Sequence, residues 1–242
     1  MIDEERMEAF VGDMKLLECR WNGHILYLLP QRAVWIPESN ALCIADTHFG
    51  KAATFRLGGL PVPSGTTSAM LQRIDSLVRA TGATTLVFLG DFIHSSRSAN
   101  RDYIDELVAW RESCSGLDVI LVRGNHDRHN LNLIEQFLFQ VVDEGEMLGG
   151  FELRHFPVDP LTAGPYRSSN NAMVLCGHLH PGCAVPVAPR LVKSFPCFVI
   201  EQKQIILPAF GEFTGLARVH PDPTKRLIAC IENEVIEIRR EK

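Results

Sequence analysis

The chain has 242 residues, of which 46% are hydrophobic and 22% charged, and such a chain can bury a core without disulfide or metal staples. No apolar run approaches the roughly 20 residues that cross a bilayer, so we expect no contact with a membrane. The formal net charge of −5 gives no support to a broadly basic nucleic-acid-binding surface, although it leaves room for a local basic groove.

Seven cysteines are scattered along the chain without a C-x-x-C pair. An odd number without regular spacing favours reduced thiols over a disulfide framework. The acidic opening, residues 1–5, lacks the basic start of a signal peptide. We therefore expect a cytoplasmic protein.

Short alternating segments at 15–19, 24–29 and 33–35 predict antiparallel strands. The continuous apolar run at 41–45 predicts a buried central strand, and it ends at Asp46. A loop rich in glycine and proline follows at 57–65. We interpret it either as a lid on the substrate side or as a plain surface connection.

Apolar spacing between Met70 and Val78 predicts an amphipathic helix. The pattern then alternates between strand and helix, and after residue 150 it changes to strands alone. The expected strands and helices are a strand at 84–89, a helix at 101–112, a strand at 118–122, a short helix at 131–139, and strands at 151–155, 172–176, 198–201, 204–207, 227–231 and 235–238. This order predicts an α/β fold with two sheets packed face to face and helices outside, in one domain spanning 1–242.

Polar residues of one kind follow several of the predicted buried strands. The segments are 46–48 (Asp-Thr-His), 90–91 (Gly-Asp), 124–127 (Gly-Asn-His-Asp) and 177–180 (Gly-His-Leu-His), and His155 ends a further candidate strand. Each motif alone is a weak signal, because an Asp or His after a strand is usually a cap or a turn residue. Together and in this order they predict one metal site at the edge of the sheets.

The donor types suit Mn²⁺, Fe²⁺ or Zn²⁺, because carboxylate, amide and imidazole groups bind borderline divalent ions. A structural zinc site would use thiolates. Seven donors exceed the needs of one ion, so we expect two ions that share a carboxylate and lie about 3.5–4 Å apart.

The ordered motifs resemble those of the calcineurin-like metallophosphoesterase superfamily, namely D-x-H, G-D, G-N-H-D/E, a lone His and G-H-x-H. The resemblance implies a four-layer α/β/β/α sandwich of two mixed sheets, with the metals at one edge. It places Asp46, His48, Asp91 and His180 around one ion. Asp91, Asn125, His155 and His178 hold the other, so that Asp91 bridges the pair. His126 is not a ligand in this scheme and faces the scissile phosphate as the catalytic residue.

A closer resemblance covers more of the chain. Segments 45–53, 55–56, 59–65, 207–211 and 213–215 are similar to the ligase-associated DNA damage response endonuclease group, PdeM. The resemblance implies manganese-dependent phosphodiester cleavage in DNA repair, association with a repair ligase or helicase, and pairing of copies into a homo-oligomer.

Several other residues are candidates for contact with the substrate. His94 lies three residues after Asp91, a spacing similar to that of repair nucleases in which this His faces DNA; the alternative is a turn residue. Basic side chains close to the motifs could hold phosphates, and they are Lys51, Arg56, Arg123 and Arg128.

The expected reaction is in-line hydrolysis of a phosphodiester by a metal-activated water, with DNA as the favoured substrate. His126 would stabilise the transition state or protonate the leaving oxygen. The alternatives are a phosphomonoesterase or small-nucleotide hydrolase with the same metals, and a catalytically weak scaffold that binds metal and partners. No G-x-S-x-G elbow or phosphate-binding loop points to another chemistry.

Overall fold

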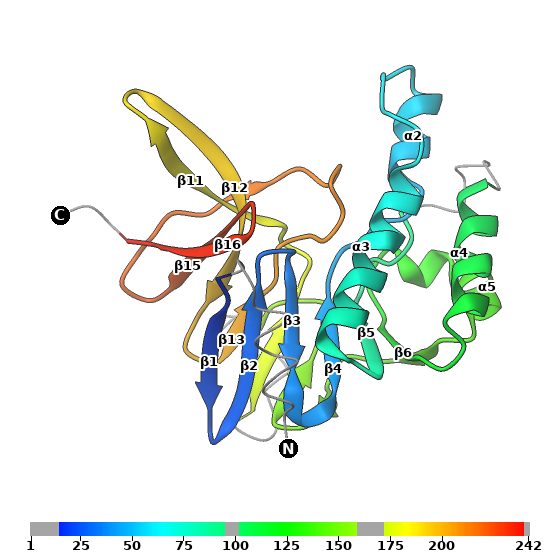
Figure 1. Cartoon of the computed structure of the whole chain (residues 1–242), viewed down its shortest axis with the longest axis horizontal. Helices are drawn as coiled ribbons and strands as arrows, with labels where there is room; N and C mark the ends of the chain where they lie inside the picture. The colour runs from blue at the N-terminus through cyan, green and yellow to red at the C-terminus, as the bar shows by residue number, and fades with distance from the viewer. Residues whose placement is uncertain (1–14, 95–101, 159–171, 240–242) are drawn as a thin grey trace.

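The computed structural model describes residues 15–94, 102–158 and 172–239. A seven-stranded sheet forms its first half (Figure 1). The strands, in order across this sheet, are β1 (Leu17–Trp21), β2 (His24–Leu29), β3 (Ala33–Ile36), β4 (Ala41–Ile44), β5 (Thr85–Leu89), β6 (Asp118–Val122) and β7 (Gln140–Val142).

The first four strands pair antiparallel and the last four pair parallel. The parallel strands read as continuous apolar runs because both of their faces are covered; all four residues of β4 are buried. Their parallel order brings the carboxyl ends of β4, β5 and β6 to one edge of the sheet. The strands predicted at 24–29, 41–45, 84–89 and 118–122 are confirmed.

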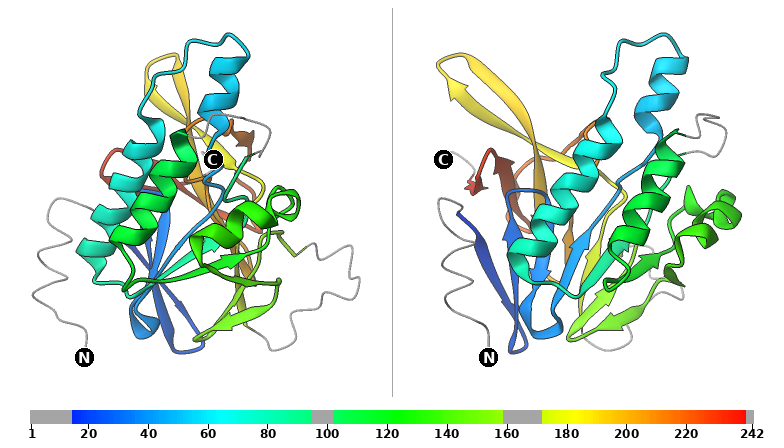
Figure 2. Two further views of the ribbon diagram at one scale, coloured as in Figure 1. Left: turned by 90° about the vertical axis from the view of Figure 1, so that its right-hand side faces the viewer. Right: turned by 45° about the vertical axis from the view of Figure 1, so that its right-hand side comes forward.

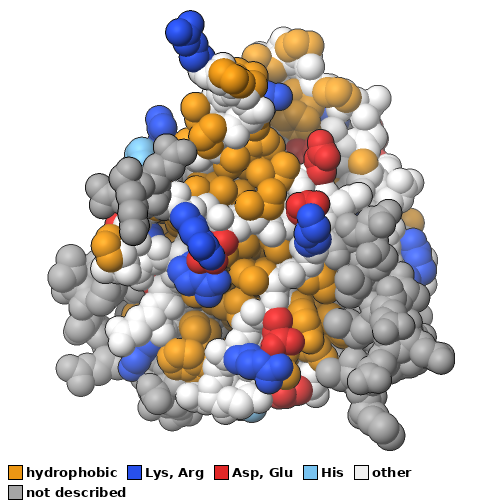
Figure 3. Space-filling model, turned by 60° about the vertical axis from the view of Figure 1, so that its left-hand side comes forward, with side chains coloured by type: hydrophobic (Ala, Val, Ile, Leu, Met, Phe, Trp, Pro, Cys, Tyr) orange, Lys and Arg blue, Asp and Glu red, His pale blue; other side chains and the backbone are white. Residues whose placement is uncertain are grey.

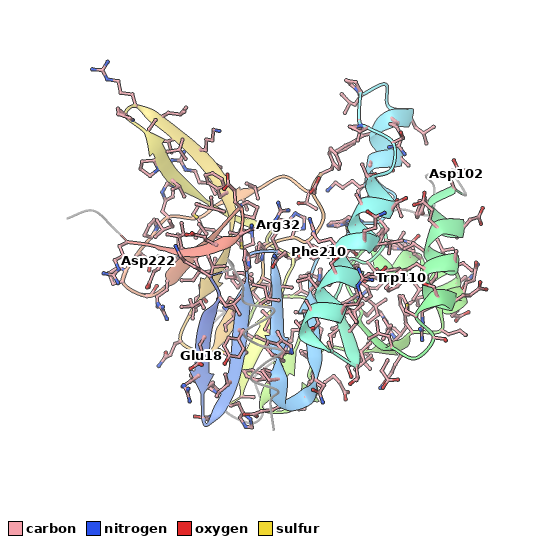
Figure 4. All side chains as sticks on the ribbon, viewed as in Figure 1. Glu18, Arg32, Asp102, Trp110, Phe210 and Asp222 are labelled. Atoms are coloured by element: carbon pink, nitrogen blue, oxygen red, sulfur yellow. The ribbon has the colours of Figure 1, made fainter. Side chains whose placement is uncertain are left out.

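Helices cover the outer face of the seven-stranded sheet (Figure 2). They are α3 (Thr66–Thr81), α4 (Asp102–Ser113) and α5 (Leu131–Ile134). The 3₁₀ turn η1 (Pro37–Ser39) lies between β3 and β4, while η2 (Asp127–His129) precedes α5 and η3 (Glu135–Phe137) follows it. Trp110 lies on α4 (Figure 4). Its Nε1 donates a 2.8 Å hydrogen bond to Oδ1 of Asp75 on α3, which ties the two helices together. The helix predicted over 131–139 is α5 continued by η3.

The second sheet is also mixed and contains nine strands. Its main path runs β14 (Ala217–Arg218), β11 (Pro181–Ala188), β12 (Leu191–Ile200), β13 (Gln204–Ile206), β10 (Met173–Cys176), β9 (Phe151–Leu153) and β8 (Glu146–Leu148). Strand β15 (Arg226–Ile231) pairs with β12 and with β16 (Glu234–Ile238). Strands β9 and β10 are parallel, so their carboxyl ends also meet at one edge.

The two sheets pack face to face around a layer of buried apolar side chains. Leu26, Val87 and Val122 come from the first sheet, and Leu175 and Phe198 come from the second. The predicted α/β fold of two mixed sheets with helices is confirmed. In the described residues the helices lie on the side of the first sheet, so the second helical layer of the prediction is not among them.

Two elements near the motifs were not predicted. Helix α2 (Lys51–Leu57) begins directly after the first motif. Strand β11 and residues 191–196 of β12 form a hairpin that contains Pro186 and Pro196. Proline lowers the strand signal because it donates no ladder hydrogen bond.

Helix α2 and the β11–β12 hairpin project beyond the sheets at the same end of the molecule (Figures 1 and 2). Hydrophobic side chains gather over the upper half of the face shown in Figure 3. The outer part of the hairpin is itself exposed and apolar at Val187, Leu191 and Val192.

Among the described residues, no helix is long and apolar enough to cross a membrane. All seven cysteines are free thiols.

Candidate dinuclear metal centre

The predicted metal ligands all lie just beyond the carboxyl ends of strands. Asp46 and His48 follow β4, Asp91 follows β5 and Asn125 follows β6, all in the first sheet. His155 follows β9, and His178 and His180 follow β10, all in the second sheet. The sheets join at this edge, because the amide of Phe210 donates to the carbonyl oxygen of Ala45 at 2.8 Å. The fold therefore brings donors from both sheets to one place.

One group of donors consists of Asp46, His48 and His180. The Nε2 atoms of His48 and His180 are 3.2 Å apart, and Nε2 of His180 lies 3.5 Å from Oδ1 of Asp46. Nε2 of His48 is 3.8 Å from Oδ2 of Asp91. These atoms surround a point where one cation could be held.

The second group consists of Asp91, His155 and His178, and Asn125 adjoins it. Nε2 of His155 lies 3.0 Å from Oδ1 of Asn125 and 3.1 Å from Nδ1 of His178. It is 3.5 Å from Oδ1 of Asp91. Because one oxygen of Asp91 faces this group and the other faces His48, Asp91 lies between the two.

Hydrogen bonds at the far side of two rings leave the correct nitrogen free for a metal. Nδ1 of His155 bonds the carbonyl oxygen of Leu89 at 3.0 Å, and Nδ1 of His180 bonds that of Thr214 at 3.2 Å. A carbonyl oxygen only accepts, so both Nδ1 atoms carry the proton and both Nε2 atoms present a lone pair.

The protonation of the buried imidazoles also suits metal binding, which requires the neutral form. Burial, reinforced by the charge of Lys51, lowers the pKa of His48 to about 2. Burial, reinforced by the neighbouring His155 imidazole, lowers the pKa of His178.

One buried carboxylate oxygen supports the fit of a cation to the first group. Oδ1 of Asp46 is buried and has no hydrogen-bond partner among the described residues. A buried oxygen of this kind costs free energy unless something compensates it. A divalent ion between Asp46, His48 and His180 would supply that compensation, so the residues present fit a metal.

The backbone at the centre is strained, as is common where function fixes the geometry. Five of the seven donors have positive φ, a region that non-glycine residues rarely adopt. The φ values are 53° at Asp46, 48° at His48, 50° at Asp91, 73° at His178 and 48° at His180. Each costs about 1–3 kcal/mol, so the surrounding structure must hold these residues in place.

The motif glycines are required because the backbone approaches the donors closely. A Cβ atom on Gly90 would overlap the ring of His155, and one on Gly124 would overlap the backbone nitrogen and Oδ1 of Asp91. A Cβ atom on Gly177 would lie 2.6 Å from Oδ2 of Asp46. Any side chain at these positions would displace a predicted ligand.

His126 lies at the open side of the centre. Its Nδ1 bonds the carbonyl oxygen of His94 at 2.8 Å, and its Nε2 lies 3.9 Å from Oδ2 of Asp91. Its side chain is 34% exposed, so it can reach a molecule in solvent. The rings of His94 and His126 stack with centroids 5.2 Å apart, and His94 therefore borders the same opening.

Asp127 is the last residue of the motif at 124–127, and no role was predicted for it from the sequence. It is fully buried, and its carboxylate accepts hydrogen bonds from the amides of Phe92 at 3.0 Å and Gly124 at 2.9 Å. Burial raises its pKa to about 6. It joins the loop after β5 to the loop after β6 and so positions Asp91 and Asn125. Its place directly after His126 is the signal that could have revealed it.

The basic candidates differ in what they contact. Lys51 begins α2 and borders the same cavity as His48. Arg56 donates to the carbonyl oxygen of Pro63 at 2.9 Å, so it braces its own loop. Nη1 of Arg123 pairs with Oδ1 of Asp143 at 3.2 Å, which offsets its charge. Of these three, the geometry favours Lys51 as a contact for substrate.

These motifs, strand ends and donor groups define a class of protein. The family model of the calcineurin-like phosphoesterases matches residues 40–182, more than half of the chain, so the chain belongs to this family. It is therefore a metal-dependent phosphoesterase.

A more particular similarity is to the crystal structure of the Pseudomonas putida nuclease MPE. The two chains share 33% sequence identity over 93% of this chain and 100% of that chain, with a TM-score of 0.74. A protein of unknown function from Aquifex aeolicus, AQ665, is 24% identical over 58% of this chain and 78% of that chain; its TM-score of 0.38 is too low to bear on the fold. No curated protein sequence matches the chain.

Proposed function

We propose that the chain is a phosphodiesterase that cleaves DNA strands with two divalent metal ions, for which Mn²⁺ is the favoured candidate. The observation that carries this proposal is the pair of donor groups on either side of Asp91. In this assignment Asp46, His48, His180 and Asp91 hold one ion, and Asp91, Asn125, His155 and His178 hold the other. When bound, the ions would supply positive charge to the phosphate oxygens and lower the pKa of water towards about 7.

His126 would act on the phosphate without binding metal. Its Nδ1 proton is held by the carbonyl oxygen of His94, so the ring has a fixed orientation. A proton on Nε2 would then face the open side and could be donated to a phosphate oxygen. The His94 carbonyl would stabilise the positive charge of the doubly protonated ring before this donation, and the ring would be neutral after it.

The distribution of charge supports a polyanionic substrate despite the net charge of −5. The segment 51–65, which contains α2, carries Lys51 and Arg56 and no acidic residue. The segment 178–200, which contains the hairpin, carries Arg190 and Lys193 and no acidic residue. Both elements project beyond the sheets at the same end (Figure 1). Positive charge on such projections favours a nucleic-acid backbone.

The experiment compares a bis-aryl phosphate with a mono-aryl phosphate in the presence of Mn²⁺, and adds nicking of plasmid and cleavage of single-stranded DNA. We expect hydrolysis of the diester and cleavage of DNA, both lost in Asp91→Ala. Preference for the monoester would establish a phosphomonoesterase instead. Hydrolysis of the diester without cleavage of DNA would remove the nuclease assignment and favour a small phosphodiester.

The wider role belongs to the same proposal. The likeness to a nuclease and to the repair endonuclease group supports a role in DNA repair beside a ligase or helicase. The seven free thiols suit a reducing, cytoplasmic setting. Increased sensitivity of a deletion strain to DNA damage, restored by the wild-type chain and not by Asp91→Ala, would test this role.

A further inference from the structure

A cavity of about 340 Å³ adjoins the metal centre. It begins at His48, and its walls are the start of α2, the loop and first turn of α3, and the segment 211–214. Its volume falls within the range of about 300–1,000 Å³ found for ligand pockets. Because His48 belongs to both the cavity and the first donor group, a group in the cavity would lie beside the phosphate held at the metals.

The charges in the cavity point to an anion. Arg73 is occupied, since its guanidinium lies 3.7 Å from the centroid of the Phe210 ring and also donates to the carbonyl oxygen of Phe210. Its Nη1 is 3.5 Å from Oε1 of Glu212, so these two charges offset each other. The ammonium group of Lys51 forms no ion pair or hydrogen bond with any residue that the structure describes. It is the cation of the cavity that remains available.

The rest of the lining is neutral and suits a ring system. Phe213 is half-buried and presents an aromatic side chain. Ser64 and Thr66 add hydroxyl groups. An aromatic face in a neutral wall is what a nucleobase stacks on, and such stacking does not depend on the base sequence.

We propose that this cavity binds the nucleotide unit next to the scissile phosphate, with Lys51 on the phosphate of that unit and Phe213 against its base. The assignment rests on the proposed phosphodiesterase function and names the part of the substrate that the centre itself does not hold. A nucleic-acid strand and a small nucleotide share this chemistry, and the experiment separates them.

The test uses two chromogenic diesters with the same leaving group, thymidine 5′-(p-nitrophenyl phosphate) and bis(p-nitrophenyl) phosphate, with Mn²⁺. The readout is the ratio of their kcat/KM values, in which a general loss of activity cancels. We expect Phe213→Ala and Ser64→Trp to lower this ratio roughly tenfold, the loss typical of one stacked base. Ser64 is exposed, so its Trp variant fills the cavity without removing a buried contact. The matched control Ser115→Trp lies in an exposed turn at the opposite end of β6 and should leave the ratio unchanged.

A single-stranded oligonucleotide tests Lys51. Lys51→Met keeps the apolar stem and removes the charge, and we expect it to raise KM for the oligonucleotide about tenfold, the size of one charge-assisted contact. The control Lys203→Met lies in the turn before β13, at the other end of the sheet, and should not raise KM. An unchanged KM in Lys51→Met, with a lowered diester ratio in the other variants, would overturn the role of Lys51 and assign the cavity to a small nucleotide.

The remaining outcomes separate this inference from the proposed function. A wild-type protein that hydrolyses diesters, with unchanged ratios in Phe213→Ala and Ser64→Trp, would overturn the cavity assignment and leave the phosphodiesterase standing. A wild-type protein that hydrolyses neither diester nor oligonucleotide would overturn both. Metal content and thermal melting of each variant establish that it is folded.

Discussion

The backbone amide of His178 donates a 2.8 Å hydrogen bond to Oδ2 of Asp46, although 132 positions separate the two residues. Asp46 follows β4 in the first sheet and His178 follows β10 in the second. The other oxygen of Asp46 has no partner among the described residues and lies 3.5 Å from Nε2 of His180. One carboxylate therefore joins the two sheets and offers a free oxygen to a cation.

Asp46→Asn separates these two roles. The amide oxygen of the substituted side chain can still accept the bond from His178, but the negative charge is lost. We expect the fold to be kept and the metal affinity to fall by at least about 10–100-fold, because removing a residue that only hydrogen-bonds to a metal ligand already has that effect. Elemental analysis after dialysis measures the metal content. Asp118→Asn, at the exposed start of β6, is the matched control, and equal metal content in both variants would contradict the assignment.

Gly124→Ala tests the close approach of backbone to Asp91. The added methyl group would overlap Asp91 and lie 3.1 Å from Oδ2 of Asp127. We expect a loss of about 1–3 kcal/mol in the free energy of unfolding, as for other overpacked sites, together with weaker metal binding. Urea denaturation measures the first effect. Gly116→Ala is the control, because nothing lies within 4 Å of its Cβ position and its φ is not positive; similar losses in both variants would show that crowding at Asp91 is not the cause.

His126→Ala removes the ring at the open side of the centre. If this residue acts on the phosphate, turnover of the diester falls by a factor of about 10²–10⁴ and metal content stays at the wild-type level. His129 is exposed three residues further on, so His129→Ala should keep its activity. Loss of metal in His126→Ala in proportion to its loss of activity would make the residue structural instead.

Removal of metal should destabilise the protein. The Nε2 atoms of His48 and His180 lie 3.2 Å apart, and Oδ1 of Asp46 is buried without a hydrogen-bond partner among the described residues, so a bound cation would stabilise this arrangement. A ligand at 100 times its Kd adds about 2.7 kcal/mol to the free energy of unfolding. We expect a chelator to lower Tm and added Mn²⁺ to restore it. A Tm that is the same with chelator and with Mn²⁺ would argue against a metal bound in the folded state.

Much of the fold could be predicted because its signals are local. The apolar runs at 41–45, 84–89 and 118–122 became β4, β5 and β6, since a strand covered on both faces must be apolar throughout. The hairpin β11–β12 was not predicted because proline residues are typical of loops and weaken the sequence signal of a strand. Helix α2 was not predicted because it is short: only seven residues lie between its N-cap Gly50 and its C-cap Gly58.

The sequence by itself determined which donors exist and that each follows a strand, because the polarity of a residue and the apolar run before it are both local properties. Only the tertiary structure decided that His155 lies against Asn125 and His178, that Arg123 pairs with Asp143, and that Lys51 borders a cavity. These relationships depend on how two sheets pack and on which groups already have partners. Contacts between chain segments far apart in sequence fix both, and no local pattern encodes them.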